Sequence, residues 1–182
     1  MSSKADEPTR PVRIIERSHR TLTGITRGRA HNVTWHWVQE FFQDPGQHLE
    51  NLLGVSSFCL ATESCLALAD ELLREQRSNW NKSGERGRIL VCLAYVLGES
   101  VLRDRPELDW VVVAEAGTEF VDDIGLGSGD EMIGVFSKLA NVENFILRED
   151  KFDLRIWKHF LSSAHLLKIH GKRLTVTLVR RD

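Results

Sequence analysis

The sequence predicts an α+β domain, with an N-terminal helical layer packed on a small, mostly antiparallel sheet from the C-terminal half. Apolar residues recur at helical spacing from Val33 to about residue 104, whereas β-branched runs that suit strands occur mostly from Asp109 onward. Helices first and strands later favour α+β over a repeated βαβ order. With 182 residues, of which 42% are hydrophobic, the chain is long enough to bury the core of one domain.

The first residues differ in character from the rest. Residues 1–20 are polar, contain Pro8 and Pro11, and are expected to form a disordered basic arm, so that residues 21–182 form the single α+β domain. Where the arm ends, the segment RTLTGITRG at residues 20–28 is a candidate for a short edge strand, because threonine and isoleucine suit strands.

Two short helices are expected first. Trp35, Val38 and Phe42 recur at spacings of three and four, which places them on one apolar stripe of a helix. The sequence DPGQ at residues 44–47 interrupts this helix and begins another, because aspartate suits the N-cap, proline the first helical position and glutamine the reciprocal capping position. The second helix should end at about Leu53, before a glycine.

Two longer helices follow. Residues 58–76 come after a pair of serines and are apolar over most of the predicted helical surface. Residues 84–104 follow Ser83, a candidate N-cap, and precede Pro106, which cannot continue a helix. Because this last helix is apolar nearly all round through its middle, we expect it to be the central element of the core.

The hydrophobic period then changes. DWVVVAE at residues 109–115 is a β-branched run that suits a buried strand, and RLTVTLVR at residues 173–180 alternates apolar and polar positions. The other expected elements are, in order, a strand at EFVDDIGL (119–126), a helix at EMIGVFSKLANV (131–142), a strand at FILRED (145–150) and a helix at DLRIWKHFLSSAHLL (153–167).

The segment VDDIGLGSGDEM at residues 121–132 combines alternating glycines with two acidic pairs. It lacks the lysine of a P-loop and the spacing of a dinucleotide-binding loop, and its carboxylates would repel phosphate. Its acids do not fall at EF-hand positions, although a cation or ligand site stays open as an alternative. We interpret it as a connector between a strand and a helix, with Asp130 and Glu131 as the cap and first-turn acid of that helix.

Charge is distributed unevenly along the chain, whose net charge is −2. Residues 1–30 carry seven basic and three acidic residues, residues 104–153 carry four basic and thirteen acidic residues, and residues 154–182 carry seven basic residues and one acidic residue. An acidic middle segment of this kind favours a basic partner protein. The candidate partner-binding residues are Asp122, Asp123, Asp130 and Glu131.

No cofactor or metal site is predicted. The histidine spacings do not place two ligands on one helix face, and the chain has no Cys-x-x-Cys motif. Cys59, Cys65 and Cys92 lie in apolar surroundings and are expected to be buried thiols in a reducing compartment. No apolar run is long enough to span a bilayer and no signal segment is recognisable, so we expect a cytoplasmic protein that does not enter a membrane.

One alternative is an enzyme. Glu63 and Glu99 each lie within a strongly apolar predicted helix, where an unpaired carboxylate would be costly. If the two helices face each other, the pair could work as an acid and a base, although structural pairing, for example of Glu99 with Arg103 one turn later, explains a buried glutamate equally well. The chain has no G-x-S-x-G motif and nothing marks a particular cysteine as reactive, so we lean against an enzyme.

A second alternative is nucleic-acid binding. The N-terminal arm is rich in arginine, and Trp35 and Trp37 follow it. This hypothesis requires the arm and the basic C-terminal strand to lie on one face, away from the acidic middle segment. The arginines concerned are Arg10, Arg13, Arg17, Arg20, Arg27 and Arg29.

The sequence LAYVLGESVL followed by DWVVV, within residues 89–123, resembles small uncharacterised bacterial domains that pair an apolar helix bearing Gly-Glu with a strand led by tryptophan. The resemblance implies helices packed on a small antiparallel sheet, as in immunity proteins and other cytoplasmic partner-binding proteins. It implies no catalytic residues. Together with the lack of catalytic motifs, it favours a cytoplasmic protein-binding module of immunity or adaptor type, whose partner and oligomeric state the sequence leaves open.

Overall fold

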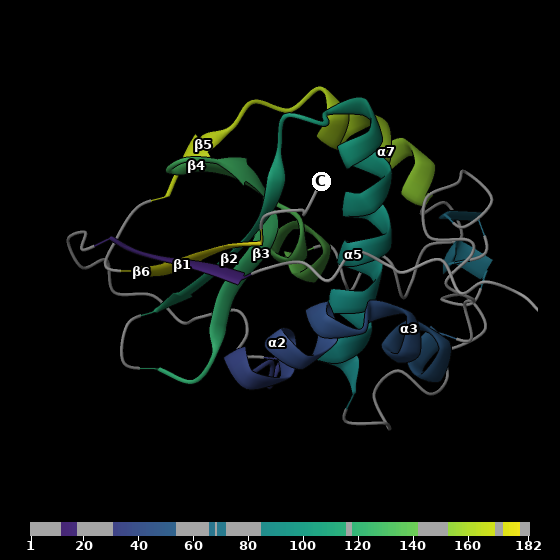
Figure 1. The fold of residues 1–182 in the computed structure, drawn as a ribbon. Coiled ribbons are helices and arrows are strands. Elements are labelled where there is room, and N and C mark those ends of the chain that lie inside the picture. Colours follow the sequence, from purple (N-terminus) through teal and green to yellow (C-terminus); the bar gives the residue numbers. More distant parts are fainter. Residues whose placement is uncertain are drawn as a thin grey trace, which may run out of the picture.

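The protein combines helices with one antiparallel sheet, which confirms the predicted α+β class (Figure 1). The helices lie along one face of the sheet, with α5 running through the middle of the molecule. The computed structural model describes residues 12–17, 31–53, 66–67, 69–71, 85–115, 118–141, 153–169 and 173–178.

Six strands form the sheet in these parts of the chain, in the order β1-β6-β2-β3-β4-β5, and every neighbouring pair is antiparallel. Four of them come from the C-terminal half as a continuous ladder, and β5 adds a two-residue edge. The strands are β1 (Val12–Arg17), β2 (Asp109–Glu115), β3 (Val121–Ser128), β4 (Glu131–Gly134), β5 (Leu167–Lys168) and β6 (Arg173–Leu178).

Strand β1 comes from the segment that we expected to be a disordered arm. It pairs with β6 over its whole length, so these six residues belong to the sheet. The rest of residues 1–20 lies outside the described residues, as does the strand expected at residues 20–28. Strand β6 itself, predicted from its alternating pattern, pairs with both β1 and β2.

The two short helices form as predicted. Helix α2 (Trp35–Gln43) begins where the Thr34 hydroxyl accepts a hydrogen bond from the Trp37 amide at 3.3 Å. Helix α3 (Pro45–Leu53) begins after Asp44, whose carboxylate accepts a hydrogen bond from the amide of the third helical residue at 3.1 Å. The DPGQ sequence therefore separates two helices through the capping that its residues favour.

Helix α5 (Arg86–Asp104) is the central element of the core, as its sequence predicted. It is buried over almost its whole circumference between α3, α7 and the sheet. The candidate cap Ser83 lies outside the described residues, as does most of the helix expected at residues 58–76, of which residues 66–67 and 69–71 are helical.

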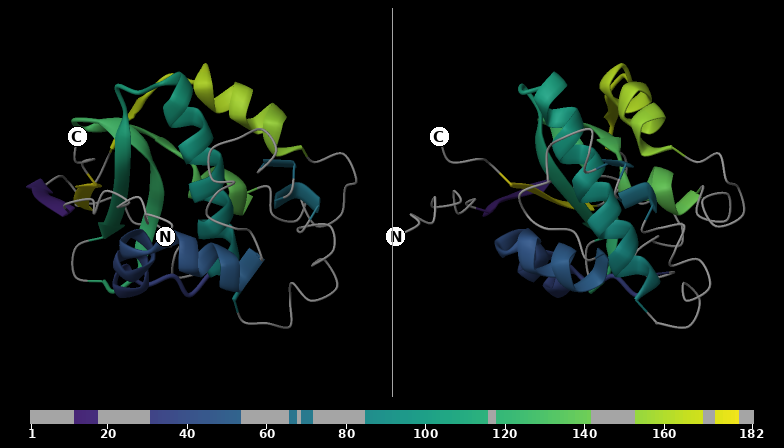
Figure 2. Two further views of the ribbon diagram at one scale, coloured as in Figure 1. Left: turned by 45° about the vertical axis from the view of Figure 1, so that its right-hand side comes forward. Right: turned by 90° about the vertical axis from the view of Figure 1, so that its right-hand side faces the viewer.

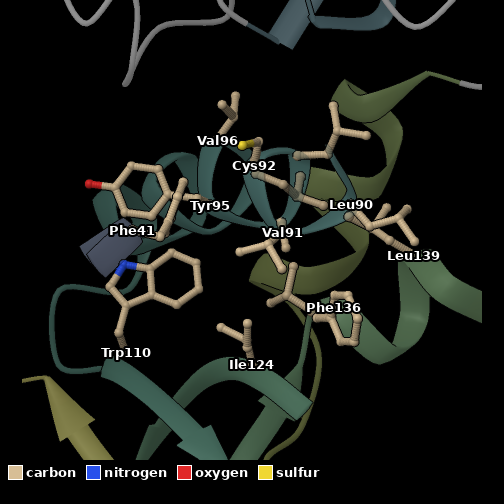
Figure 3. Packing of buried hydrophobic residues seen from close by; sticks show 14 of the residues in the cluster. Phe41, Leu90, Val91, Cys92, Tyr95, Val96, Trp110, Ile124, Phe136 and Leu139 are labelled. Carbon is tan, nitrogen blue, oxygen red and sulfur yellow. The ribbon is translucent and has the colours of Figure 1, made fainter. Parts of the chain in front are cut away.

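The main core lies between α5 and the inner face of the sheet. Figure 3 shows the side chains of Trp110 and Ile124 pointing from β2 and β3 toward Tyr95 and Val91 of α5. On β2 the alternate residues, which include Val113, contribute instead to a smaller apolar cluster on the other face of the sheet. Both faces of this central strand are therefore buried, which agrees with its continuous β-branched sequence.

The Gly-Glu pair of α5 and the tryptophan that leads β2 contact each other. A methyl group at Gly98 would collide with the ring of Trp110, so the helix approaches the indole this closely only because residue 98 is glycine. The next residue, Glu99, accepts a hydrogen bond from the indole N–H at 2.7 Å. Gly98 thus allows close packing against the Trp110 ring, and Glu99 fixes the orientation of that ring through a hydrogen bond.

Helix α7 (Leu154–Ser162) lies against α5, at the end of that helix remote from α2 and α3 (Figure 2). Its predicted N-cap is confirmed, because Asp153 accepts a hydrogen bond from the Arg155 amide at 2.8 Å. The helix is shorter than the expected 153–167 segment, since Leu167 and Lys168 instead pair with β4 as strand β5.

The strand expected at residues 119–126 is confirmed as β3, which pairs with β2, whereas the connector expected at residues 121–132 and the first part of the helix expected at residues 131–142 were wrong. Residues 121–134 form a β-hairpin in which Ser128 pairs with Glu131, and among the described residues of the expected helix those at 136–141 are helical. Asp130 lies in the hairpin turn and Glu131 begins β4, so neither caps a helix. The strand expected at FILRED, residues 145–150, lies outside the described residues.

Candidate functional site

The four acids proposed for partner binding lie at the two ends of β3. Asp122 and Asp123 begin the strand, whereas Asp130 and Glu131 follow its end. Ser128, the residue that pairs with Glu131, lies five positions after Asp123 along the strand, which is about 17 Å at roughly 3.3 Å per residue. The fold therefore keeps the two acidic pairs apart instead of gathering them into one patch.

Asp123 is committed to a contact inside the protein. Its carboxylate accepts hydrogen bonds from the Ser137 hydroxyl at 2.6 Å, from the Ser137 amide at 2.9 Å and from the Ile124 amide at 2.8 Å. Loss of water around the carboxylate raises its pKa to about 6; the Asp122 charge adds to this effect and the hydrogen bonds oppose it. Asp123 thus ties β3 to the short helix at residues 136–141.

The alternating glycines are explained by the hairpin and require no bound ligand. A Cβ at Gly125 or Gly127 would collide with backbone carbonyl oxygens of β4, so both positions allow the two strands to approach closely. Gly129 has a φ of +65° in the turn, a conformation that favours glycine. At Gly134 the corresponding space is filled by Asp123 and Ser137.

The carboxylate pair proposed for catalysis is not brought together by the described residues. Glu99 is half-buried and holds the Trp110 indole, which gives it a structural use. Glu63 lies outside the described residues, so the shared acid and base site remains a prediction. Sequence analysis considered Arg103 as the partner of Glu99 but did not find Trp110, because that contact joins a helix to a strand.

The arginines proposed for nucleic-acid binding fall partly on β1. In the β1–β6 ladder, Arg17 is paired with Arg173 and Arg13 with Thr177. The N-terminal and C-terminal basic segments therefore lie side by side in the sheet. The other proposed arginines lie outside the described residues: Arg10, Arg20, Arg27 and Arg29.

The outer side of α7 exposes large apolar side chains that sequence analysis did not single out. Ile156 is 64% exposed and Phe160, one helical turn later, is 57% exposed. Trp157, which is half-buried, contacts the Phe160 ring edge-on at 5.9 Å between ring centroids. The opposite side of the helix is held in the core by Leu154 and Leu161. Alpha-helical spacing of apolar residues on two sides of this segment was the available signal.

Basic groups lie on both sides of the exposed apolar pair. Lys138, from the short helix at residues 136–141, places its ammonium 5.9 Å from the centroid of the Phe160 ring. Arg155 and His159 are exposed on the other side of this apolar pair. We call Ile156, Phe160 and these three basic groups the α7 outer face.

Among the described residues, the acids Asp104 and Asp153 contact α7 on its inner side or at its start. Asp104 of α5 contacts the Lys158 ammonium at 3.5 Å and accepts a hydrogen bond from Ser162 at 2.9 Å. Asp153 binds the Arg155 guanidinium through both carboxylate oxygens, and these hydrogen bonds lower its pKa despite partial loss of water. The α7 outer face is thus apolar with a basic border.

In the part of the chain that the structure describes, no three metal-ligating side chains are grouped, and no helix has the length and apolar character needed to cross a membrane. Cys92 is a buried free thiol whose pKa is raised by loss of water, while Cys59 and Cys65 lie outside this part. Comparisons with protein-family models, curated proteins and solved structures find no match to this chain. The resemblance to small bacterial domains at residues 89–123 therefore stays a prediction.

Proposed function

We propose that the chain is a cytoplasmic protein-binding module, of immunity or adaptor type, that holds its partner on the α7 outer face. The observation that carries this proposal is the exposure of Ile156 and Phe160 on the outer side of a helix whose Leu154 and Leu161 are buried in the core. Covering such side chains contributes roughly 1–2 kcal/mol each, because much of their apolar area is still in water. Exposed apolar groups with a charged border are typical of protein-binding surfaces.

Hydrogen bonds to the rest of the protein fix both ends of the α7 segment, as suits a binding surface. Two hydrogen bonds from the Leu154 amide to the buried carboxylate of Asp70 fix the start of the helix, at 3.0 and 3.2 Å. Beyond its end, Arg105 donates a hydrogen bond to the Ala164 carbonyl at 2.8 Å. A partner would meet a helix that is already held in place, which lowers the entropy cost of binding.

The acidic pairs at the two ends of β3 support binding less well than α7 does. They form two separate pairs, and Asp123 already serves three donors within the protein. A basic partner would need to span the length of the strand to meet all four. We therefore place the partner on α7 and retain the acidic pairs as the competing surface for the test.

The test compares recovery of partners from a lysate of the source cells by three forms of the protein. Substituting Ile156→Asp and Phe160→Asp places charges on α7 and should abolish recovery of the specific partner. The matched control carries Asp122→Asn, Asp130→Asn and Glu131→Gln, and should retain it. Far-ultraviolet circular dichroism and the unfolding midpoint confirm that both variants fold. Retention by the α7 variant together with loss by the control would refute the α7 site in favour of the acidic surface.

Nucleic-acid binding is a second candidate, because β1 and β6 bring the two basic ends of the chain together. Its test is affinity for a generic DNA duplex at two salt concentrations, for the full chain and for a variant with Arg13→Gln and Arg17→Gln. Affinity should fall steeply with salt, by close to one power of salt concentration per phosphate contact, and the variant should show a smaller slope. Absence of binding at low salt removes this candidate.

A further inference from the structure

We infer that the partner presents an acidic amphipathic helix to the α7 outer face. This inference rests on the proposed function and specifies the chemistry of its partner. Its two supports are the arrangement of apolar residues along α7 and the charge of the segment that contains α7.

The apolar arrangement suits a second helix. Ile156 and Phe160 are four residues apart, so they form a short ridge along the exposed side of α7. Lys138 borders the ridge beside Phe160, and Arg155 and His159 border it on the other side. A helix with an apolar stripe and acids beside that stripe would match both features, as flanking charges do at paired helices in coiled coils.

The charge of the described residues that contain α7 is positive. Residues 154–169 carry Arg155, Lys158 and Lys168 and no aspartate or glutamate, and Lys168 lies opposite Glu131 in the β4–β5 pair. Asp153, at the start of the helix, is bound to Arg155, and Asp104 is bound to Lys158. These two carboxylates balance two of the positive charges, and Lys138 beside Phe160 adds another, so the surroundings of α7 keep a net positive charge that favours an acidic partner within about 8–10 Å at physiological salt.

Other occupants fit less well. A second copy of the chain would place two basic borders against each other in a symmetric α7 contact, which is unfavourable. An anionic membrane would meet the basic border, but α7 has nine residues and offers Ile156 and Phe160 as its exposed large apolar side chains. That ridge is short compared with the apolar faces of most membrane-surface helices.

The experiment uses two synthetic peptides of about 18 residues, long enough to be substantially helical. Both carry leucine at helical spacing; one has glutamate and alanine at the other positions and the second has lysine in place of glutamate. Binding of each fluorescently labelled peptide to the full chain is measured by anisotropy. We expect the glutamate peptide to bind, to weaken with added salt, and to bind much more tightly than the lysine peptide.

Variants separate the two contributions. Lys138→Gln with Arg155→Gln should weaken binding of the glutamate peptide about three- to tenfold, whereas Gln43→Glu with Asn51→Glu, the same change in net charge on α2 and α3, should have a smaller effect. Ile156→Asp with Phe160→Asp should weaken it by at least about tenfold.

The outcomes distinguish this inference from the proposed function. The acidic helix is wrong if the lysine peptide binds as well as the glutamate peptide, or if the glutamate peptide does not bind up to about 1 mM. In either case, loss of the natural partner from the Ile156→Asp and Phe160→Asp variant would still support binding at α7. Binding to vesicles containing phosphatidylserine but to neither peptide would identify a membrane surface instead. Self-association through α7 in sedimentation measurements would identify a second copy and likewise overturn the inference.

Discussion

Replacing Gly98 with alanine tests the contact that joins α5 to β2. The added Cβ would lie 2.5 Å from Cζ2 and 3.1 Å from Cζ3 of Trp110. The indole has little room to move, because it is 1% exposed and contacts the rings of Tyr95 and Phe42, at 5.5 and 5.4 Å between ring centroids. Overpacking of this kind costs roughly 1–3 kcal/mol, and the better helix propensity of alanine returns about 1 kcal/mol. We expect a net destabilisation of up to about 2 kcal/mol.

A double-mutant cycle with Trp110→Phe isolates this contact. The smaller ring leaves space for the Cβ, so Gly98→Ala should be neutral or stabilising in the Trp110→Phe background, with a coupling energy of about 1 kcal/mol or more. The free energy of unfolding is measured by urea denaturation with tryptophan-independent circular dichroism. If the two substitutions are additive within about 0.5 kcal/mol, or if Gly98→Ala alone stabilises the protein, the close packing described at this site is wrong.

Two further predictions concern the hydrogen-bonded carboxylates of Asp123 and Glu99. The folded-state pKa of Asp123 is raised from 3.8 to about 6, so its contribution to stability is fully present below about pH 4 and is lost as the pH rises through 6. The free energy of unfolding should therefore fall by an amount on the order of 2–3 kcal/mol over this range. Asp123→Asn should flatten the fall, which is measured by urea midpoints from pH 4 to pH 7.5. Glu99→Gln retains an oxygen that accepts the Trp110 N–H and should lower the stability by less than about 1 kcal/mol. Glu99→Leu leaves the indole N–H unpaired and should lower the stability by about 1–3 kcal/mol. Equal losses of stability in thermal unfolding would show that the hydrogen bond does not contribute to stability.

Sequence patterns located the helices well because their signals are local. The cap at Asp44, the apolar stripe that includes Phe42 and the cap at Asp153 each depend on residues within one or two turns. The central position of α5 also followed from its sequence, since a helix that is apolar on all sides must be covered on all sides.

The β3–β4 hairpin could not be predicted in the same way. Gly125 and Gly127 are unfavourable in isolated strands, and they occur here because β4 approaches β3 too closely for a side chain. Met132 and Phe136 have helical spacing, but Met132 packs on the outer face of the sheet and Phe136 in the main core. Tertiary packing therefore overrides the local pattern at this point.

Long-range pairing explains the other differences. Nothing in Val12–Arg17 shows that it will pair with Arg173–Leu178, since the two segments are far apart in the chain. The spacing of Ile156 and Phe160 is consistent with a helix, but which side of that helix stays in water depends on where α5 lies. The candidate binding face thus became visible only in the folded chain.

Binding at the α7 outer face is tested most directly by amide chemical shifts of the isotopically labelled protein during titration with the glutamate peptide. We predict that the largest changes fall on residues 155–160 and on Lys138, with little change at Asp122 and Asp130 at the two ends of β3. Changes that cluster at the ends of β3 and leave Ile156 and Phe160 unaffected would contradict the assignment of this face.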